Sequence, residues 1–337
     1  MRDYTIGPDA SGQRLDRYLI KLLPEAGKSF LQKMIRKKRI KLNGGRAEAS
    51  AMLHDGDIVR LYFSDETITA FSGGPKQTVS PESLPSGLRS SFNNPVFEDE
   101  DYLVISKPAG VLSQPDHTGE LSAAEAARAF IHGTETFSPA PLTRLDRNTS
   151  GVLLFPKNYE AQKRALASIR DRDTDKEYLT VVSGTITSPG ELRSRLSRDG
   201  TDMKTRSGGD DSKEAVLEYR PLASADGYTL LLVRLLTGRT HQIRAQFEQN
   251  GTPVAGDTKY GSREVNRELR ERFGVRSQLL HAYRYALRDD DGTYLDVSAP
   301  LPDDFAAVIR GIFSGQTLGS LQAGASGSGS LSDKRNS

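Results

Sequence analysis

The chain has 337 residues, with 46 Lys and Arg against 44 Asp and Glu, so its net charge is only +2. This length suits about two domains, and an apolar share of 36% lets each bury a core. The absence of cysteine excludes disulfides and thiolate metal sites, and no apolar run is long enough to cross a bilayer. We therefore expect a cytoplasmic protein without membrane contact.

The first 63 residues are expected to form a small α/β domain. Apolar residues recur at helical spacing over 15–23, and a second amphipathic helix is expected around 31–38. Strands follow at 39–42 and 58–63, and Asn43-Gly44-Gly45 between them is a strong turn signal.

A strongly basic segment lies in this domain. From Lys28 to Arg46 there are eight Lys or Arg residues and no Asp or Glu. A merely solvated helix face normally carries acidic partners one turn away, so their absence favours a surface that binds RNA phosphates. The residues expected to form it are Lys33, Arg36, Lys37, Lys38, Arg39 and Lys41.

Three further segments are expected along the chain. Residues 64–94 are rich in Ser, Gly, Pro and Thr and are interpreted as a linker. Residues 95–313 alternate strands with helices, and several connections are too short for crossover helices. This favours an α+β domain on a mixed, largely antiparallel sheet. The Gly-Ser-rich tail, 314–337, is expected to be disordered.

Strands and helices of the larger domain can be placed by their patterns. The apolar runs predict strands at 102–106, 152–155, 178–182, 215–219 and 228–235. Helices are expected at 122–131, 159–171, 240–249 and 264–272.

The stretch 142–155 carries the most informative chemistry. It places Asp146 between Arg144 and Arg147, ahead of a Thr-Ser-Gly turn and a short apolar run. Taken alone, this is either a structural ion pair at a strand entrance or a functional carboxylate held by cations.

Other stretches accompany it in a fixed order. They are Lys-Pro-Ala-Gly at 107–110, Lys-Glu-Tyr at 176–178, Thr-Gly-Arg-Thr-His-Gln-Ile-Arg at 237–244, Gly-Asp-Thr-Lys-Tyr-Gly at 256–261 and Leu-Leu-His-Ala at 279–282. Each is weak singly, but the ordered set is specific.

With these stretches the chain resembles the pseudouridine synthases of the RluA family, in particular the RluC- and RluD-like enzymes. In those enzymes the catalytic domain follows an RNA-binding domain like that of ribosomal protein S four. The resemblance implies an isomerase that modifies uridine in structured RNA and requires no cofactor. Its expected partner is large-subunit ribosomal RNA. Breaking a glycosidic bond builds positive charge on the sugar, which a carboxylate can stabilise or trap.

The resemblance also implies roles for the site residues. Asp146 is the catalytic carboxylate. Three roles stay open for it: attack on the sugar, attack on the base and removal of a sugar proton. Arg239 is its cationic partner. Tyr178 stacks on the target base and is the candidate for taking the proton from carbon five, and Ile243 lines the uracil pocket. Arg144 enters the space that the extruded base leaves.

Three further basic residues have two open interpretations. They bind phosphates or solvate the rim of the site: Lys107, Arg147 and Arg244.

One residue departs from the family pattern. Thr143 stands where the family usually has a histidine, and a threonine can hydrogen-bond but cannot stack or carry charge. This puts the fine geometry of the pocket in doubt rather than the core chemistry.

Several alternatives stay open at this point. The chain could be an inactive RNA-binding assembly factor or a synthase for transfer RNA. A nucleotide-using enzyme is disfavoured because a P-loop is lacking, and the five scattered histidines suggest no metal site. A monomer is expected, and the target uridine is not readable from one chain.

Overall fold

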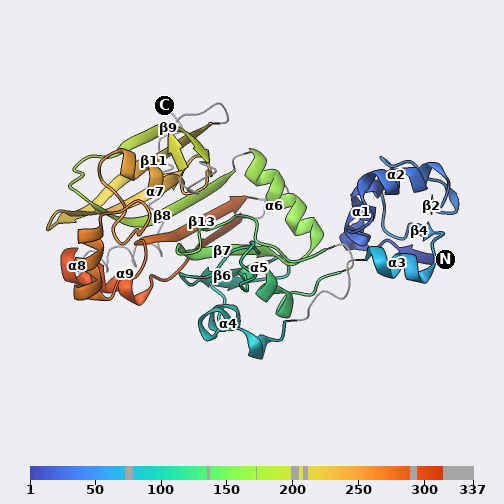
Figure 1. The fold of residues 1–337 in the computed structure, drawn as a ribbon, viewed down its shortest axis with the longest axis horizontal. Helices are drawn as coiled ribbons and strands as arrows, with labels where there is room; N and C mark the ends of the chain where they lie inside the picture. Colours follow the sequence, from blue (N-terminus) through green and yellow to red (C-terminus); the bar gives the residue numbers. More distant parts are fainter. Residues whose placement is uncertain are drawn as a thin grey trace.

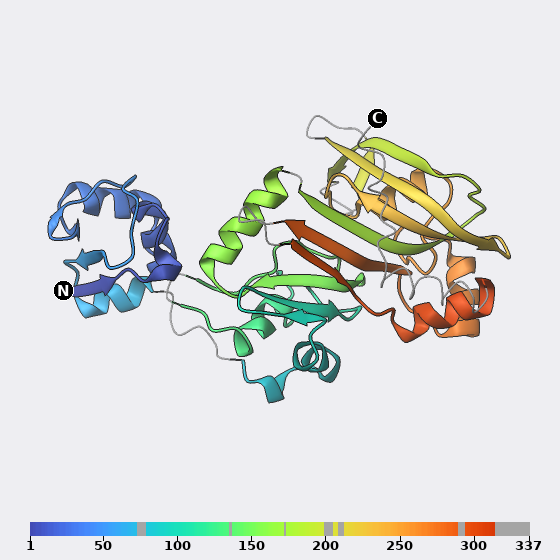
Figure 2. The same ribbon diagram turned by 180° about the vertical axis from the view of Figure 1, so that it is seen from behind.

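The computed structural model describes residues 1–72, 79–134, 137–171, 173–198, 205–207, 212–288 and 294–313. These residues form a small N-terminal unit and a larger α+β unit built on one long sheet (Figures 1 and 2). The tail expected to be disordered, 314–337, lies outside the described residues.

In the small unit, the first two helices lie over an antiparallel sheet in the order β1-β4-β2-β3. Its elements are β1 (Arg2–Thr5), α1 (Leu15–Leu22), α2 (Lys28–Arg36), β2 (Ile40–Leu42), β3 (Gly45–Arg46) and β4 (Ile58–Leu61), with a 3-10 turn at Pro8–Ala10. The apolar faces of both helices meet the sheet in one core that includes Leu19, Leu31 and Val59. The predicted α/β character is confirmed.

The expectation that 64–94 is a linker was wrong for two parts of it. Helix α3 (Asp65–Phe71) begins at Ser64, whose hydroxyl accepts a hydrogen bond from the Thr67 N–H, and it packs Ile68 into the small unit's core. Helix α4 (Ser86–Asn93) packs Leu88 and Phe92 into the larger unit. A few apolar residues at helical spacing are enough to anchor a segment of otherwise polar composition.

The larger unit contains a ten-stranded sheet in the order β10-β9-β11-β12-β8-β13-β7-β6-β5, with β14 pairing to β13. Its pairs are antiparallel except for β7 with β13. The strands are β5 (Phe97–Glu98), β6 (Tyr102–Lys107), β7 (Ser150–Pro156), β8 (Thr174–Ser183), β9 (Gly190–Arg198), β10 (Thr205–Ser207), β11 (Lys213–Ala225), β12 (Tyr228–Leu235), β13 (Leu280–Arg288) and β14 (Tyr294–Ser298). All five predicted strands are present.

Helices cover both faces of this sheet, since alternate strand residues point to opposite sides. On β7, Leu153 and Phe155 pack with α4 and α5, whereas Leu154 packs against α6. The helices are α5 (Ala123–Ala126, continued as a 3-10 turn over Ala127–Ala129), α6 (Tyr159–Asp171), α7 (Gln242–Gln249), α8 (Arg263–Phe273) and α9 (Asp303–Val308, continued as a π-helical turn over Ile309–Phe313).

The two units meet along α6. The Lys21 ammonium of α1 lies 4.5 Å from the centroid of the Tyr159 ring, at the start of α6. Figures 1 and 2 show the small unit beside the end of this helix.

Gly151 explains the Thr-Ser-Gly turn. It has φ +112° and pairs with Ala282 in the parallel β7–β13 ladder. A Cβ at this position would lie 2.1 Å from the Ala282 carbonyl oxygen. Only glycine allows this close approach, which brings the loop before β7 next to the centre of the sheet.

Candidate active site

The loop that carries Asp146 is fixed on both sides by hydrogen bonds. Before it, the Ser113 hydroxyl donates to the Leu145 carbonyl (2.9 Å) and accepts from the Leu145 N–H (3.0 Å). After it, the Arg147 carbonyl accepts from the Gly110 N–H (2.9 Å) and from Lys107 Nζ (3.0 Å). The backbone of the candidate catalytic residue is thus held in place by the Lys-Pro-Ala-Gly stretch and its continuation.

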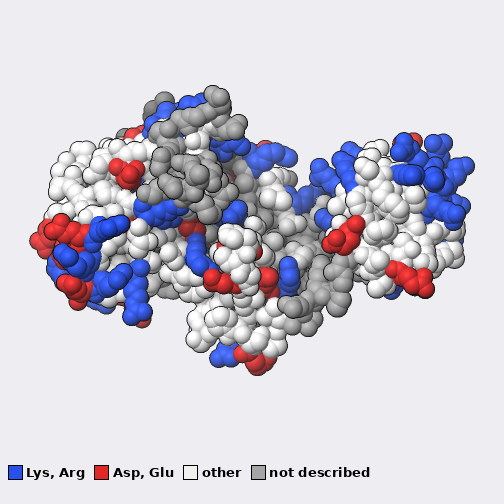
Figure 3. Space-filling view, viewed as in Figure 1, with Lys and Arg blue, Asp and Glu red and all other residues white. Residues whose placement is uncertain are grey.

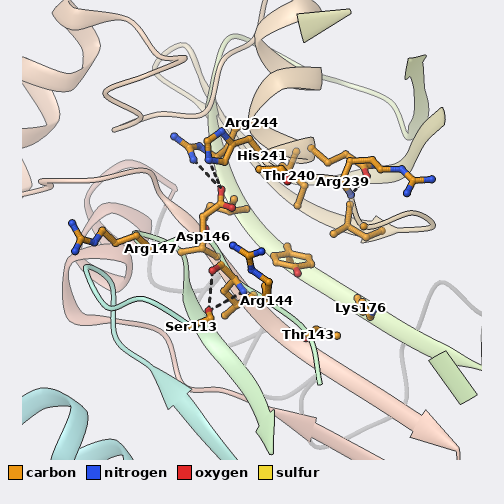
Figure 4. Close-up of a pocket in the computed structure, with 18 of the residues that line it drawn as sticks. Ser113, Thr143, Arg144, Asp146, Arg147, Lys176, Arg239, Thr240, His241 and Arg244 are labelled. Carbon is orange, nitrogen blue, oxygen red and sulfur yellow. Dashed lines mark hydrogen bonds and ion pairs between the residues drawn. The ribbon is translucent and has the colours of Figure 1, made fainter. Parts of the chain in front are cut away.

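Arg244, not Arg239, is the partner of Asp146, so the predicted pairing was wrong. Arg244 Nη1 lies 2.9 Å from Asp146 Oδ2 (Figure 4). Asp146 keeps 23% of its side chain exposed, whereas Arg244 keeps 7%. The carboxylate therefore faces both solvent and a buried guanidinium.

The physical reason for this error is the position at which α7 begins. The helix starts at Gln242, so Arg244 lies in its first turn and points inward, while Arg239 lies in the preceding turn. Arg239 Nε donates to the Glu214 carbonyl (2.9 Å), and its exposed side chain points away from Asp146 in Figure 4.

A second carboxylate anchors Arg244 from behind. Asp257 is fully buried and accepts hydrogen bonds from Arg244 Nε (2.6 Å) and Nη2 (3.0 Å). It also accepts from the backbone N–H groups of Lys259 (2.8 Å) and Tyr260 (3.1 Å). This bidentate pair fixes the plane of the guanidinium that reaches Asp146.

The charges of this cluster stabilise one another. Burial alone disfavours the charged forms of Arg244 and Asp257, but their mutual hydrogen bonds and opposite charges outweigh the effect of burial. The pKa of Arg244 is therefore raised above its ordinary value, chiefly through Asp257 and then through Asp146. The pKa of Asp257 is lowered, through Arg244 and the two backbone donors.

Sequence reasoning did not include Asp257 among the site residues. The signal was the Gly-Asp-Thr-Lys-Tyr-Gly stretch. A Cβ on Gly256 would lie 2.3 Å from the Ser277 carbonyl oxygen, and one on Gly261 would lie 2.4 Å from that of Asp257. The two glycines mark a tight turn that buries the carboxylate between them.

His241 was missed as well. It caps α7 in the left-handed conformation, with φ +54°. Its Nδ1 lies 3.0 Å from the Tyr260 hydroxyl, and its Nε2 lies 3.9 Å from Asp146 Oδ2. Burial lowers its pKa, although the Asp146 charge opposes this. The signal was the histidine within the 237–244 stretch.

A cavity of about 570 Å³ opens above Asp146. Arg144, Thr143, Tyr178, Ile243 and the exposed Arg239 all line it, so the structure brings these predicted residues to one place. Burial, assisted by the nearby charge of Asp146, raises the pKa of Tyr178 and keeps its phenol neutral at ordinary pH.

Lys107 does not face this cavity, and its predicted role at the rim or on phosphates was wrong. Its side chain is fully buried, and Nζ donates to the carbonyls of Pro108 (3.0 Å), Val111 (2.8 Å) and Arg147 (3.0 Å). Burial lowers its pKa to about 7, against the attraction of Asp146. Lys107 therefore stabilises the loop that carries Asp146 by binding its backbone carbonyls.

The remaining predicted cations differ in their partners. Arg147 lines the cavity but forms an ion pair with Glu120, and Figure 4 shows it pointing away from Asp146. Arg244 is likewise occupied by two carboxylates and is too buried to solvate the rim. Arg144 is exposed on the cavity wall and forms no ion pair with a described residue.

The predicted basic surface is present on and after α2. Side chains of Lys33, Arg36, Lys37, Lys38 and Arg39 are exposed, and Lys41 is half-buried, with its ammonium 5.4 Å from the Tyr62 ring centroid. Figure 3 shows Lys and Arg gathered over this end of the small unit. None of the six is ion-paired within the part of the chain that the structure describes.

Within the described ranges, the structure offers neither a metal site nor a membrane-spanning helix. No group of three or more His, Asp or Glu side chains there could hold a metal ion. No helix there is long and apolar enough to span a bilayer.

Known proteins share both the sequence pattern and the fold. Residues 101–249 match the RNA pseudouridylate synthase family. Ribosomal large subunit pseudouridine synthase D of Xanthomonas campestris is 29% identical over 326 residues, covering 93% of this chain and 92% of its own. The uncharacterized RNA pseudouridine synthase YlyB of Bacillus subtilis is 27% identical over 318 residues, covering 92% and 97%.

Solved structures give the same architecture. Human RNA pseudouridylate synthase domain containing 4 superposes with a TM-score of 0.54 at 21% identity, covering 66% of this chain and 94% of its own. Human RNA pseudouridylate synthase domain containing 1 gives a TM-score of 0.52 at 24% identity, covering 68% of this chain and 94% of its own. At this identity the likeness supports the fold alone.

Fold, motifs and family match together define an RNA pseudouridine synthase, an isomerase that acts on RNA. Within that class the chain belongs to the RluA family, as its ordered stretches predict.

Proposed function

We propose that this enzyme isomerises uridine in structured RNA, with large-subunit ribosomal RNA as its substrate and Asp146 as its catalytic carboxylate. The observation that carries the proposal is the chain of contacts from buried Asp257 through Arg244 to Asp146 at the cavity. Several relatives are named ribosomal large subunit pseudouridine synthase C or D, which supports the substrate class.

The geometry suits a carboxylate that acts on the sugar. Arg244 and His241 both approach Oδ2 of Asp146, and no described residue donates to Oδ1. Oδ1 is therefore available to the positive charge that grows on carbon one of the ribose as its bond to uracil nitrogen one breaks. Arg244 keeps the carboxylate ionised and oriented for this role.

The base must then turn within the cavity and rejoin the sugar through carbon five. The proton on carbon five leaves and nitrogen one gains one, so the product is an isomer of the substrate. As a neutral phenol, Tyr178 can stack on the uracil during this turn, and Ile243 supplies an apolar wall that excludes water. Arg144, which lies on the wall and pairs with no described carboxylate, can enter the space that the extruded base leaves.

The basic surface is proposed to hold the RNA outside the cavity. Its cations are mostly exposed and form no ion pair with a described acidic residue, so they are suited to backbone phosphates, which give affinity with little sequence reading. Target choice then depends on the shape of the RNA around the extruded uridine.

The proposal is tested with Asp146→Asn on in vitro transcribed large-subunit ribosomal RNA. The isosteric variant removes the charge, while Asp257 still holds Arg244, so folding and RNA binding should be retained. Pseudouridine formation, mapped by sequencing, should fall below detection. Asp3→Asn, which alters an exposed pair with Arg60 in the small unit, is the matched control and should stay active.

Two results would count against the proposal. Normal pseudouridine formation by Asp146→Asn would remove this residue from the chemistry. A wild-type protein that binds the RNA but modifies no uridine in it would favour a binding factor instead.

A further inference from the structure

Lys176 is unlike the other buried or half-buried cations near Asp146. Arg147 and Arg244 are paired with carboxylates, and Lys107 donates to three carbonyls. Lys176 lines the same cavity, yet it donates no hydrogen bond and forms no ion pair with any residue that the structure describes. Among the described residues, the Tyr285 ring lies closest to this charge as a partner, with its centroid 5.7 Å from Nζ.

The position of Lys176 in the sheet explains where its side chain lies. It precedes Tyr178 by two residues on β8, so both side chains are on the same face of the strand. It is also directly opposite Tyr285 on β13, which accounts for the contact with that ring. Figure 4 shows Lys176 on the wall opposite Arg147.

This arrangement is costly without a ligand. Lys176 is half-buried, burial lowers its pKa, and no carboxylate of the described residues forms an ion pair with it. An ammonium withdrawn from water without a partner destabilises the folded state. An anion entering the cavity would supply the missing partner.

We propose that Lys176 binds a backbone phosphate that flanks the extruded uridine. This inference rests on the function proposed above. A uridine that enters the cavity brings its sugar and flanking phosphates to the cavity wall, and a lysine binds such a phosphate as a compact charge. Unlike the surface on α2, which can hold RNA in any state, this contact forms only when a nucleotide occupies the cavity.

The test uses an RNA fragment that contains a uridine modified by the wild-type enzyme. Lys176→Gln should raise KM about tenfold, which corresponds to one contact of about 1.4 kcal/mol, and leave kcat within about twofold. Lys176→Arg keeps the charge, so its KM should return most of the way to the wild-type value. Lys157→Gln, which breaks an exposed pair with Glu98, is the control and should change neither constant.

A neutral methylphosphonate placed next to the target uridine identifies the ligand. It should raise the KM of the wild-type enzyme about tenfold and have little further effect on Lys176→Gln. If the methylphosphonate and Lys176→Gln instead raise KM by factors that multiply, Lys176 does not contact that phosphate. Testing the two flanking positions separately distinguishes the phosphate on either side.

Stability separates this role from a structural one. Lys176→Gln removes an unpaired charge, so its melting temperature should equal or exceed that of the wild type. A lower melting temperature, a loss in kcat alone or an unchanged KM would overturn the inference while leaving the proposed function intact. If the wild-type enzyme modifies no RNA, the proposed function itself fails.

Discussion

The anchor behind the active site gives the sharpest prediction. Asp257→Asn keeps the size of the side chain but removes its charge and replaces one acceptor oxygen with an NH₂ donor that faces the Arg244 guanidinium. Breaking a buried pair from one side costs about 3–5 kcal/mol, and here the buried Arg244 charge keeps only its single contact with the partly exposed Asp146. Asp257 is fully buried and Arg244 only 7% exposed, so solvent screening gives little relief.

The expected effect is large in both stability and activity. For a domain of this size, each kcal/mol shifts the melting temperature by about 2–4 °C, so Asp257→Asn should lower it by roughly 10 °C. Its kcat should also fall, because Arg244 is no longer held against Asp146.

Thermal unfolding followed by circular dichroism measures this effect against a matched surface pair. Arg284 makes the same two-pronged contact with Asp296, at 2.7 and 2.5 Å, but Asp296 is 36% exposed. Asp296→Asn should therefore cost no more than about 1 kcal/mol. Equal melting temperatures for the two variants would refute the view that burial makes the Arg244–Asp257 pair critical.

Three other predictions follow from the fold and from charge. Gly151→Ala should destabilise the larger unit by about 3 kcal/mol or more, because the new Cβ meets a backbone carbonyl; Gly110→Ala, which shares the positive φ but has open space around it, should cost less in urea unfolding. Burial lowers the pKa of His281 to about 4 from 6.5, so its contribution to stability is complete above pH 6.5 and lost as pH falls towards 4. That loss is about 3 kcal/mol, and unfolding of His281→Gln should show a correspondingly weaker acid dependence. Reversing Lys37 and Arg39 to glutamate should weaken RNA binding several-fold and reduce the salt slope by at least about 1.5, as measured by filter binding; an unchanged slope would remove α2 from the RNA interface.

The sequence by itself determined the elements and the stretches that carry chemistry. Apolar runs gave the positions of β6, β7, β12 and the second half of β8, because a strand segment buried on both faces is largely apolar. The order of the short motifs gave the family, because the reaction needs particular residue types on neighbouring strands and loops.

The sequence could not decide which cation serves which partner. Arg239 and Arg244 lie in one stretch, and the starting point of α7 decides that only Arg244 turns inward. Helix boundaries depend on tertiary contacts such as the Gln242 side chain, which accepts the Arg239 N–H and donates to the Val216 carbonyl.

Burial likewise separates residues that are alike in sequence. Lys107 ends β6, and Lys176 lies near the start of β8. Lys107 is enclosed by three carbonyls, whereas Lys176 lines the cavity and pairs with no carboxylate among the described residues. Asp257, distant in sequence from Asp146, joins the site only because the chain folds back beside α7. The role of a charged side chain is set by the partners and the solvent around it, and those are properties of the assembled structure rather than of the local sequence.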